Sequence, residues 1–89
     1  MGEVTLKHLV QFIKTSLSQG KFRLSIHAAE RLEERFVTLA DIKHCGKTAK
    51  TIVFQEDKET WKVIGKDLGG KKFTVICDLD EEIVVVTVF

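Results

Sequence analysis

The chain has 89 residues, of which 44% are hydrophobic and 30% charged, and its net charge at pH 7 is +1. This length allows one small domain with a single core, and we expect that domain to span residues 1–89. The longest apolar run, 83–86, is too short to cross a membrane, and no signal peptide is visible. We therefore expect a cytoplasmic protein without a membrane partner.

The first half of the chain has helical periodicity. Aliphatic residues recur at helical spacing over 5–18, and Gly20 follows as a stop signal. A bridge over 21–24 leads to the next element. We therefore predict a first helix that packs one apolar face against the rest of the domain.

Two further helices are predicted after this bridge. Ser25 is a candidate N-cap for a second helix over about 26–36. Thr38 and Asp41 have the spacing of a capping box for a short third helix that ends near Cys45. The first half of the chain is therefore expected to hold three helices.

The second half changes to the two-residue period of strands. Charged, turn-like segments separate four β-rich runs, which cover 51–55, 61–66, 72–78 and 83–89. Short links between successive strands require antiparallel neighbours. We therefore predict an α+β fold in which the N-terminal helices pack on a four-stranded antiparallel sheet.

The predicted second helix has two chemically different faces. The chain reads S-I-H-A-A-E-R-L-E-E-R-F over 25–36. At about 100° per residue, one face carries His27, Arg31 and Arg35, with Glu34 among them. The other face carries Ala28, Ala29, Leu32 and Phe36. Because imidazole exchanges a proton near neutral pH and guanidinium grips phosphate with a rigid fork, the polar face suits cleavage of a phosphodiester.

A simpler interpretation of this polar face is a solvated helix surface. Glu30 or Glu34 could pair with Arg31 or Arg35 at helical spacing for a few tenths of a kcal/mol. In that case the face would have no function beyond solubility.

Charge is distributed unevenly along the chain. Residues 1–50 hold nine Lys and Arg against five Asp and Glu, a net charge of +4, whereas residues 51–89 have a net charge of −3, from five against eight. The half that carries His27 is therefore basic, and a local basic surface can bind a phosphate backbone.

No cofactor site is expected. The cysteines and histidines lack the spacing of a zinc site, so we predict no metal and expect Cys45 and Cys77 to be reduced, buried thiols. The segment G-K-D-L-G-G-K at 65–71 has P-loop spacing, but Lys72 replaces the required Ser or Thr and a predicted strand follows. We therefore predict a hairpin turn at 69–70 and no nucleotide cofactor.

A larger pattern resembles a known family. It consists, in order, of S-x-H-A-x-x-R-L-x-x-R at 25–35, W-x-V-I-G-x-D at 61–67, F-T-V at 73–75 and V-V-T-V-F at 85–89. Over residues 22–89 it resembles small bacterial and phage domains grouped with the RelE-like and BrnT-like toxins. These belong to the wider superfamily of barnase, EndoU and colicin-type ribonucleases.

The resemblance implies a RelE-like, metal-independent endoribonuclease that is the toxin of a toxin-antitoxin pair, with RNA and a cognate antitoxin as partners. In such chemistry the ribose 2′-hydroxyl attacks the adjacent phosphorus. The resemblance implies that His27 is the general base or acid and that Arg31 and Arg35 hold the phosphate. Thr87 could hydrogen-bond a phosphate oxygen, or could serve only in sheet packing.

Two departures keep other functions open. Family members often carry an aromatic hydroxyl where Trp61 and Phe89 stand, and this chain has no tyrosine and is less basic than many toxins. The alternative is a non-catalytic RNA- or protein-binding module of the same fold, and a third is a purely structural domain. If the face is catalytic, His27 should share a solvent-facing groove with both arginines, and Thr87 should lie nearby on a central final strand.

Overall fold

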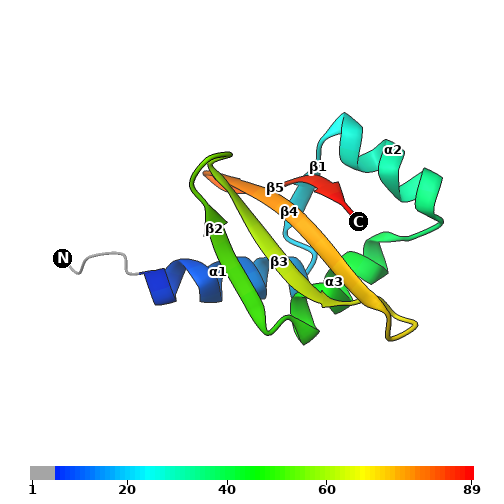
Figure 1. The fold of residues 1–89 in the computed structure, drawn as a ribbon, viewed down its shortest axis with the longest axis horizontal. Helices are drawn as coiled ribbons and strands as arrows, with labels where there is room; N and C mark the ends of the chain where they lie inside the picture. The colour runs from blue at the N-terminus through cyan, green and yellow to red at the C-terminus, as the bar shows by residue number, and fades with distance from the viewer. Residues whose placement is uncertain (1–5) are drawn as a thin grey trace.

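The structure, a computed structural model, describes residues 6–89 (Figure 1). The helices are α1 (Leu6–Ser18), α2 (Ile26–Arg35) and α3 (Leu39–Thr48). The strands are β1 (Phe22–Leu24), β2 (Thr51–Gln55), β3 (Thr60–Lys66), β4 (Lys72–Asp80) and β5 (Glu82–Val88). The predicted start of the first helix at Thr5 lies outside the described residues.

The sheet has five strands in the order β1-β5-β4-β3-β2. Strands β2 to β5 form the predicted antiparallel meander, whereas β1 pairs parallel to β5, with Phe22 opposite Ile83. The α+β class is therefore confirmed, and the four-stranded antiparallel sheet is corrected to a five-stranded mixed one. The segment predicted as a bridge over 21–24 contains the three-residue strand β1. A strand this short cannot display a two-residue period in sequence.

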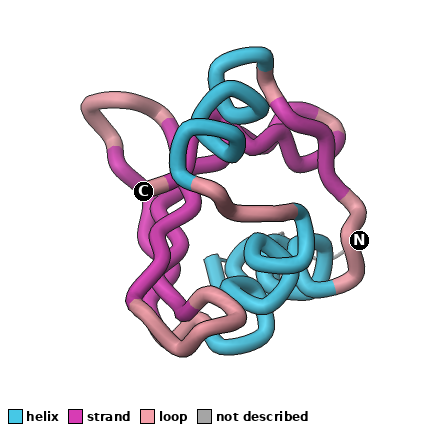
Figure 2. The backbone as a smooth tube through the Cα atoms, turned by 90° about the vertical axis from the view of Figure 1, so that its right-hand side faces the viewer, coloured by secondary structure: helices cyan, strands magenta, loops and turns pink. Residues whose placement is uncertain are grey.

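Helices α1 and α3 cover one face of the sheet and enclose the core (Figures 1 and 2). The largest fully buried side chains come from both layers: Ile13, Leu17 and Ile42 from the helices, and Ile83, Val63, Val75, Val85 and Val88 from the strands. In Figure 1 the opposite face of β2, β3 and β4 points toward the viewer, and none of the three described helices crosses it. We call this surface the open face.

Two glycines allow α3 to pack closely between α1 and β3. A Cβ atom on Gly65 would lie 2.3 Å from the carbonyl oxygen of Cys45, and a Cβ atom on Gly46 would lie 2.7 Å from Cβ of Leu17. Gly46 therefore packs against α1 from within the helix, and α3 continues to Thr48 rather than ending near Cys45 as predicted. A glycine that signals a helix end in sequence serves here as a packing contact.

Hydrogen bonds hold both ends of α3. The Asp41 carboxylate accepts from the backbone N–H groups of Thr38, at 2.8 Å, and of Leu68, at 2.9 Å. At the other end, Lys14 Nζ donates to the carbonyl oxygens of Gly46, Lys47 and Ala49, at 2.9 to 3.0 Å. The Leu68 bond ties α3 to the β3–β4 hairpin, and the other contacts satisfy backbone groups at the helix ends that the helix itself leaves unpaired.

Helix α2 begins as predicted but ends one residue earlier. The Ser25 hydroxyl accepts from the backbone N–H of Ala28 at 3.0 Å, which confirms the N-cap. Phe36 adopts the left-handed conformation, with φ 55°, and its side chain is 93% exposed, so its predicted place on the core face is wrong. The chain reverses at this residue, and Val37 packs against the core instead, with its N–H bonded to the carbonyl oxygen of Leu32.

Of the other predicted core residues on α2, Ala28 and Leu32 are buried, whereas Ala29 is exposed. The apolar contact of this helix is therefore narrower than its sequence suggests. Most of its circumference faces solvent.

Candidate functional site

The polar face of α2 lies beside the C-terminal end of β5. Ser25 Oγ donates to the carbonyl oxygen of Val86 at 2.8 Å, and Arg31 Nε donates to that of Val88 at 3.4 Å. The helix therefore follows the last residues of the strand for about two turns. His27, which lies between these two anchor points in the sequence, is exposed.

The two guanidiniums of this face are not neutralised by neighbouring carboxylates. Arg31 is half-buried and Arg35 is exposed, and neither forms an ion pair with Glu30, Glu34 or any other described acidic residue. The His27 side chain likewise makes no hydrogen bond to the described part of the chain. The helix thus presents an imidazole and two cations that have no intramolecular ion-pairing role. We call these three side chains the α2 basic face.

Thr87 lies where the pairing of β4 and β5 is irregular. Ile76 is opposite Thr87 and Cys77 is opposite Val85, so Val86 is an additional residue in β5. Bulges of this kind change the direction of side chains and are frequent beside functional sites. The half-buried Thr87 side chain lines a pocket on the open face, and the strand that carries it is also held by α2.

This open-face pocket has a volume of about 380 Å³. Its polar lining comes from Gln55, Lys58, Thr60, Lys62 and Thr87, and its apolar lining from Ile76, Val86 and Phe89. The cross-strand partners Lys62, Ile76 and Thr87 form one row over three strands. The final strand is inside the sheet but not at its centre, because β4 is the middle strand of five. The prediction of a central final strand is corrected accordingly.

Sequence reasoning did not identify the two pocket lysines. Lys62 stands between the buried residues Trp61 and Val63, so the strand period alone places it on the opposite face. What the sequence lacked was any sign that this face is uncovered. Phe89 lines the pocket, whereas Trp61 faces the core side and packs on Phe54.

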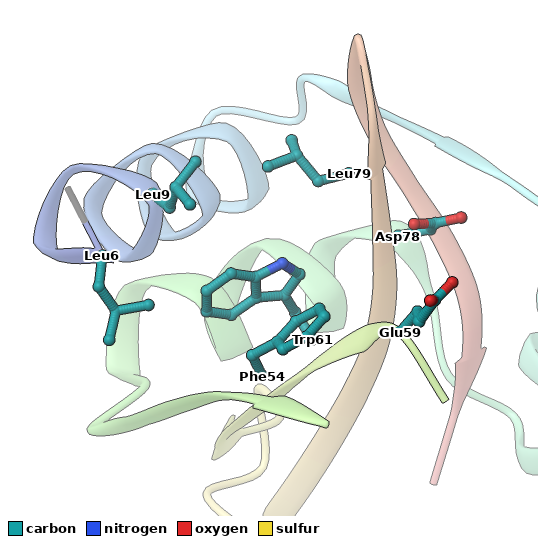
Figure 3. A pocket seen from close by; sticks show the side chains of 7 residues that line it. All are labelled: Leu6, Leu9, Phe54, Glu59, Trp61, Asp78 and Leu79. Atoms are coloured by element: carbon teal, nitrogen blue, oxygen red, sulfur yellow. The ribbon is translucent and has the colours of Figure 1, made fainter. Parts of the chain in front are cut away.

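A second pocket, of about 360 Å³, lies on the core side of the sheet beside α1 (Figure 3). Its walls are apolar, from Leu6, Leu9, Phe54, Trp61 and Leu79. Its two charged residues are carboxylates, Glu59 and Asp78, which lie on the other side of the Trp61 ring from Leu6 in Figure 3. Without a cation or an imidazole in its lining, this pocket is unsuited to phosphate chemistry.

The cysteines are buried thiols and are not disulfide-bonded. Burial raises the pKa of Cys45 to about 11 and that of Cys77 to about 12, so both stay protonated near neutral pH. Over residues 6–89, no group of three or more His, Cys, Asp or Glu side chains is arranged to hold a metal ion.

The P-loop-like segment is a hairpin. The backbone N–H of Gly70 donates to the carbonyl oxygen of Asp67 at 3.0 Å, and Gly70 has φ 82°. Strand β4 begins at Lys72, where a phosphate-binding loop would require a helix. The predicted turn is therefore confirmed.

Comparison with protein families adds one assignment. Residues 24–89 match the domain of unknown function DUF4258, and the chain belongs to this family. The match covers both the α2 basic face and the final strand with Thr87. No curated protein and no solved structure matches the chain. Within the described residues, no helix is long and apolar enough to cross a membrane.

Proposed function

We propose that this protein is a metal-independent endoribonuclease of the RelE-like type and the toxin of a toxin-antitoxin pair. One observation carries the proposal: α2 presents the exposed His27 and Arg35 and the half-buried Arg31 on one face beside the end of β5, and no described carboxylate is paired to either arginine. The motif resemblance over 22–89 supports the same chemistry, and it includes all three of these residues.

In the proposed reaction the ribose 2′-oxygen attacks the adjacent phosphorus, and the bond from phosphorus to the 5′-oxygen breaks. The products are a 2′,3′-cyclic phosphate and a 5′-hydroxyl. His27 accepts the 2′-hydroxyl proton or protonates the leaving 5′-oxygen, and because the face is open to solvent, water exchanges the other proton.

The cations would act on the phosphate itself. Arg31 and Arg35 each offer a planar fork of donors for the phosphate oxygens, whose negative charge increases in the transition state. The Thr87 hydroxyl is on the adjoining strand and can donate one further hydrogen bond. The substrate would be single-stranded RNA, because its backbone can bend around an exposed helix. The partner that restrains the activity would be a cognate antitoxin protein.

The proposal is tested by incubating the protein with single-stranded RNA in the presence of a chelator. We expect fragments that end in 2′,3′-cyclic phosphate, since proton transfer and charge stabilisation are both supplied by side chains. Cleavage that requires added magnesium, or no cleavage at all, would contradict the proposed mechanism.

Substitutions separate catalysis from binding. His27→Ala should lower the cleavage rate by about 10² to 10⁴ and leave RNA affinity nearly unchanged, because general acid-base catalysis acts in the transition state. Arg31→Ala and Arg35→Ala should weaken both cleavage and binding. His27→Ala with full activity would reject its assignment, and affinity without cleavage in the native protein would favour the binding-module alternative.

A further inference from the structure

The open-face pocket and the α2 basic face adjoin across the end of β5. Val86, Thr87 and Phe89 line the pocket, while the carbonyl groups of Val86 and Val88 accept hydrogen bonds from Ser25 and Arg31. A chain that lies with one phosphate against α2 can therefore continue across β5 into the pocket. The row from Thr87 to Lys62 spans about 10 Å, since neighbouring strands are about 4.8 Å apart.

The lining of the pocket matches the two parts of a nucleotide. Phe89, Ile76 and Val86 form an apolar surface on which the face of a base can stack, and an aromatic side chain does this for every base. Lys58 and Lys62 supply positive charge for a phosphate. The Thr60 hydroxyl and the Gln55 amide can hydrogen-bond the edge of the base or the ribose.

The position of Phe89 in the fold supports this role. Its backbone N–H and carbonyl groups both pair with Thr74, at 2.9 and 2.7 Å, so the residue is fixed to the edge of the open face. Its side chain is nevertheless 44% exposed. A held but uncovered ring is available to a planar ligand without a large loss of conformational freedom.

From these contacts we infer that the open-face pocket binds the nucleotide that neighbours the cleaved phosphate, with Lys62 on the next phosphate and Phe89 stacked on the base. The inference rests on the proposed function for its orientation relative to the cleaved bond. Binding of the nucleotide itself is independent of cleavage, so the two proposals can fail separately.

The test uses a labelled single-stranded RNA oligonucleotide with methylated 2′-hydroxyls, which cannot be cleaved by 2′-oxygen attack. Lys62→Gln should weaken its binding roughly tenfold and reduce the slope of log affinity against log salt by about 0.7. The matched control is Lys66→Gln, which removes the same charge from an exposed position on the same strand outside the pocket and should change affinity less than about twofold.

The ring is tested by Phe89→Leu, which should weaken binding about tenfold without a change in the salt slope, and by Phe89→Trp, which should restore it. Circular dichroism and the melting temperature check that each variant is folded. Equal losses for Lys62→Gln and Lys66→Gln, or no loss for Phe89→Leu, would overturn the inference.

The outcomes also separate this inference from the proposed function. If the pocket variants weaken binding but the native protein never cleaves RNA, the pocket assignment stands and the ribonuclease proposal fails. If RNA is cleaved and Lys62→Gln leaves the KM unchanged, the ribonuclease proposal stands and the pocket assignment fails. If the methylated oligonucleotide does not bind, the nucleotide assignment is rejected. It is also rejected if the pocket substitutions weaken binding of a protein partner but not of the oligonucleotide.

Discussion

Helices α2 and α3 have ten residues each, yet they differ in how much of their surface serves the fold. Helix α3 lies between α1 and β3, touches both through glycines, and has hydrogen bonds from other elements at both ends. Helix α2 contacts β5 and β1, buries Ala28 and Leu32, and leaves its basic face in solvent. Charged side chains of α3 and its neighbours thus stabilise the domain, whereas on α2 the Arg31 side chain has one hydrogen bond to β5 and no ion pair within residues 6–89, and that of Arg35 has neither.

From this difference we expect the residues around α3 to contribute mainly to stability and the polar face of α2 mainly to function. Substitutions around α3 should lower the free energy of unfolding, whereas substitutions on the polar face of α2 should leave it nearly unchanged. Stability measurements on variants of both helices and their neighbours therefore test the comparison most directly.

Gly65→Ala should have the largest effect. The new Cβ would lie 2.3 Å from the carbonyl oxygen of Cys45, so α3 must move away from β3. We expect a loss of about 3 kcal/mol in the free energy of unfolding. Urea denaturation followed by circular dichroism measures it, with Gly69→Ala as the control because Gly69 lies in the exposed hairpin. Equal stability of the two variants would disprove the close packing of α3 on β3.

Lys14→Met should have the next largest effect. The substitution keeps most of the aliphatic length and leaves three carbonyl oxygens at the end of α3 without their ammonium donor. We expect a loss of about 2 kcal/mol. Lys7→Met, an exposed position on the same helix, is the matched control. A Lys14→Met variant as stable as the control would mean that water replaces the ammonium at no cost.

Asp41→Asn should cost about 1 kcal/mol at pH 7 through loss of the charged cap. Burial raises the pKa of this carboxyl group, but hydrogen bonds from Leu68 and Thr38 outweigh burial and leave the pKa below its ordinary value. Because the pKa of Asp41 is lower in the folded than in the unfolded protein, its ionisation stabilises the fold at pH values above the unfolded pKa. This stabilisation is lost as the pH falls through the folded-state pKa.

The stability difference between the native protein and Asp41→Asn should therefore be constant from pH 7 to about 5 and shrink below about pH 4. Thermal melts across this range measure it. A difference that persists unchanged at acidic pH would show that the carboxylate charge does not contribute.

Phe36→Gly should have the smallest effect, and the opposite sign. Phe36 has a left-handed backbone at the end of α2 and an exposed ring, so glycine removes strain without removing a core contact. We expect a gain of up to about 1 kcal/mol, or about 4 °C in melting temperature. Phe36→Ala, which keeps the backbone strain, should show no comparable gain. A destabilised glycine variant would indicate that the ring contributes to the fold.

Most of the secondary structure could be predicted from local patterns. Ser25 as N-cap, the stop at Gly20 and the turn at Gly70 are decided by a few neighbouring residues, and all three are found. Strand β1 could not be predicted, because three residues acquire a strand conformation only by pairing with β5. Phe36 was misplaced because helical periodicity does not reveal where the helix ends.

Part of the candidate site could likewise be predicted from local sequence, and part depends on tertiary contacts. Helix phase alone placed His27, Arg31 and Arg35 together, since their angular separation is fixed by the helix geometry. Thr87 is on the strand that α2 contacts, and it lines the same pocket as Lys62 and Phe89. This placement depends on which strand lies beside α2 and which sheet face stays uncovered. Such placement rests on contacts between residues far apart in sequence, such as the hydrogen bond from Ser25 to Val86, which are 61 positions apart.

The sequence by itself determined the α+β class, the limits of most elements and the polar face of α2, because each follows from the rotation per residue of a helix or strand. Only the tertiary structure decided that β1 joins the sheet beside β5, that α2 follows the end of β5, and that the pocket holding Thr87 is open. Chain segments come into contact through packing of the whole core, and that packing is not encoded in any local period.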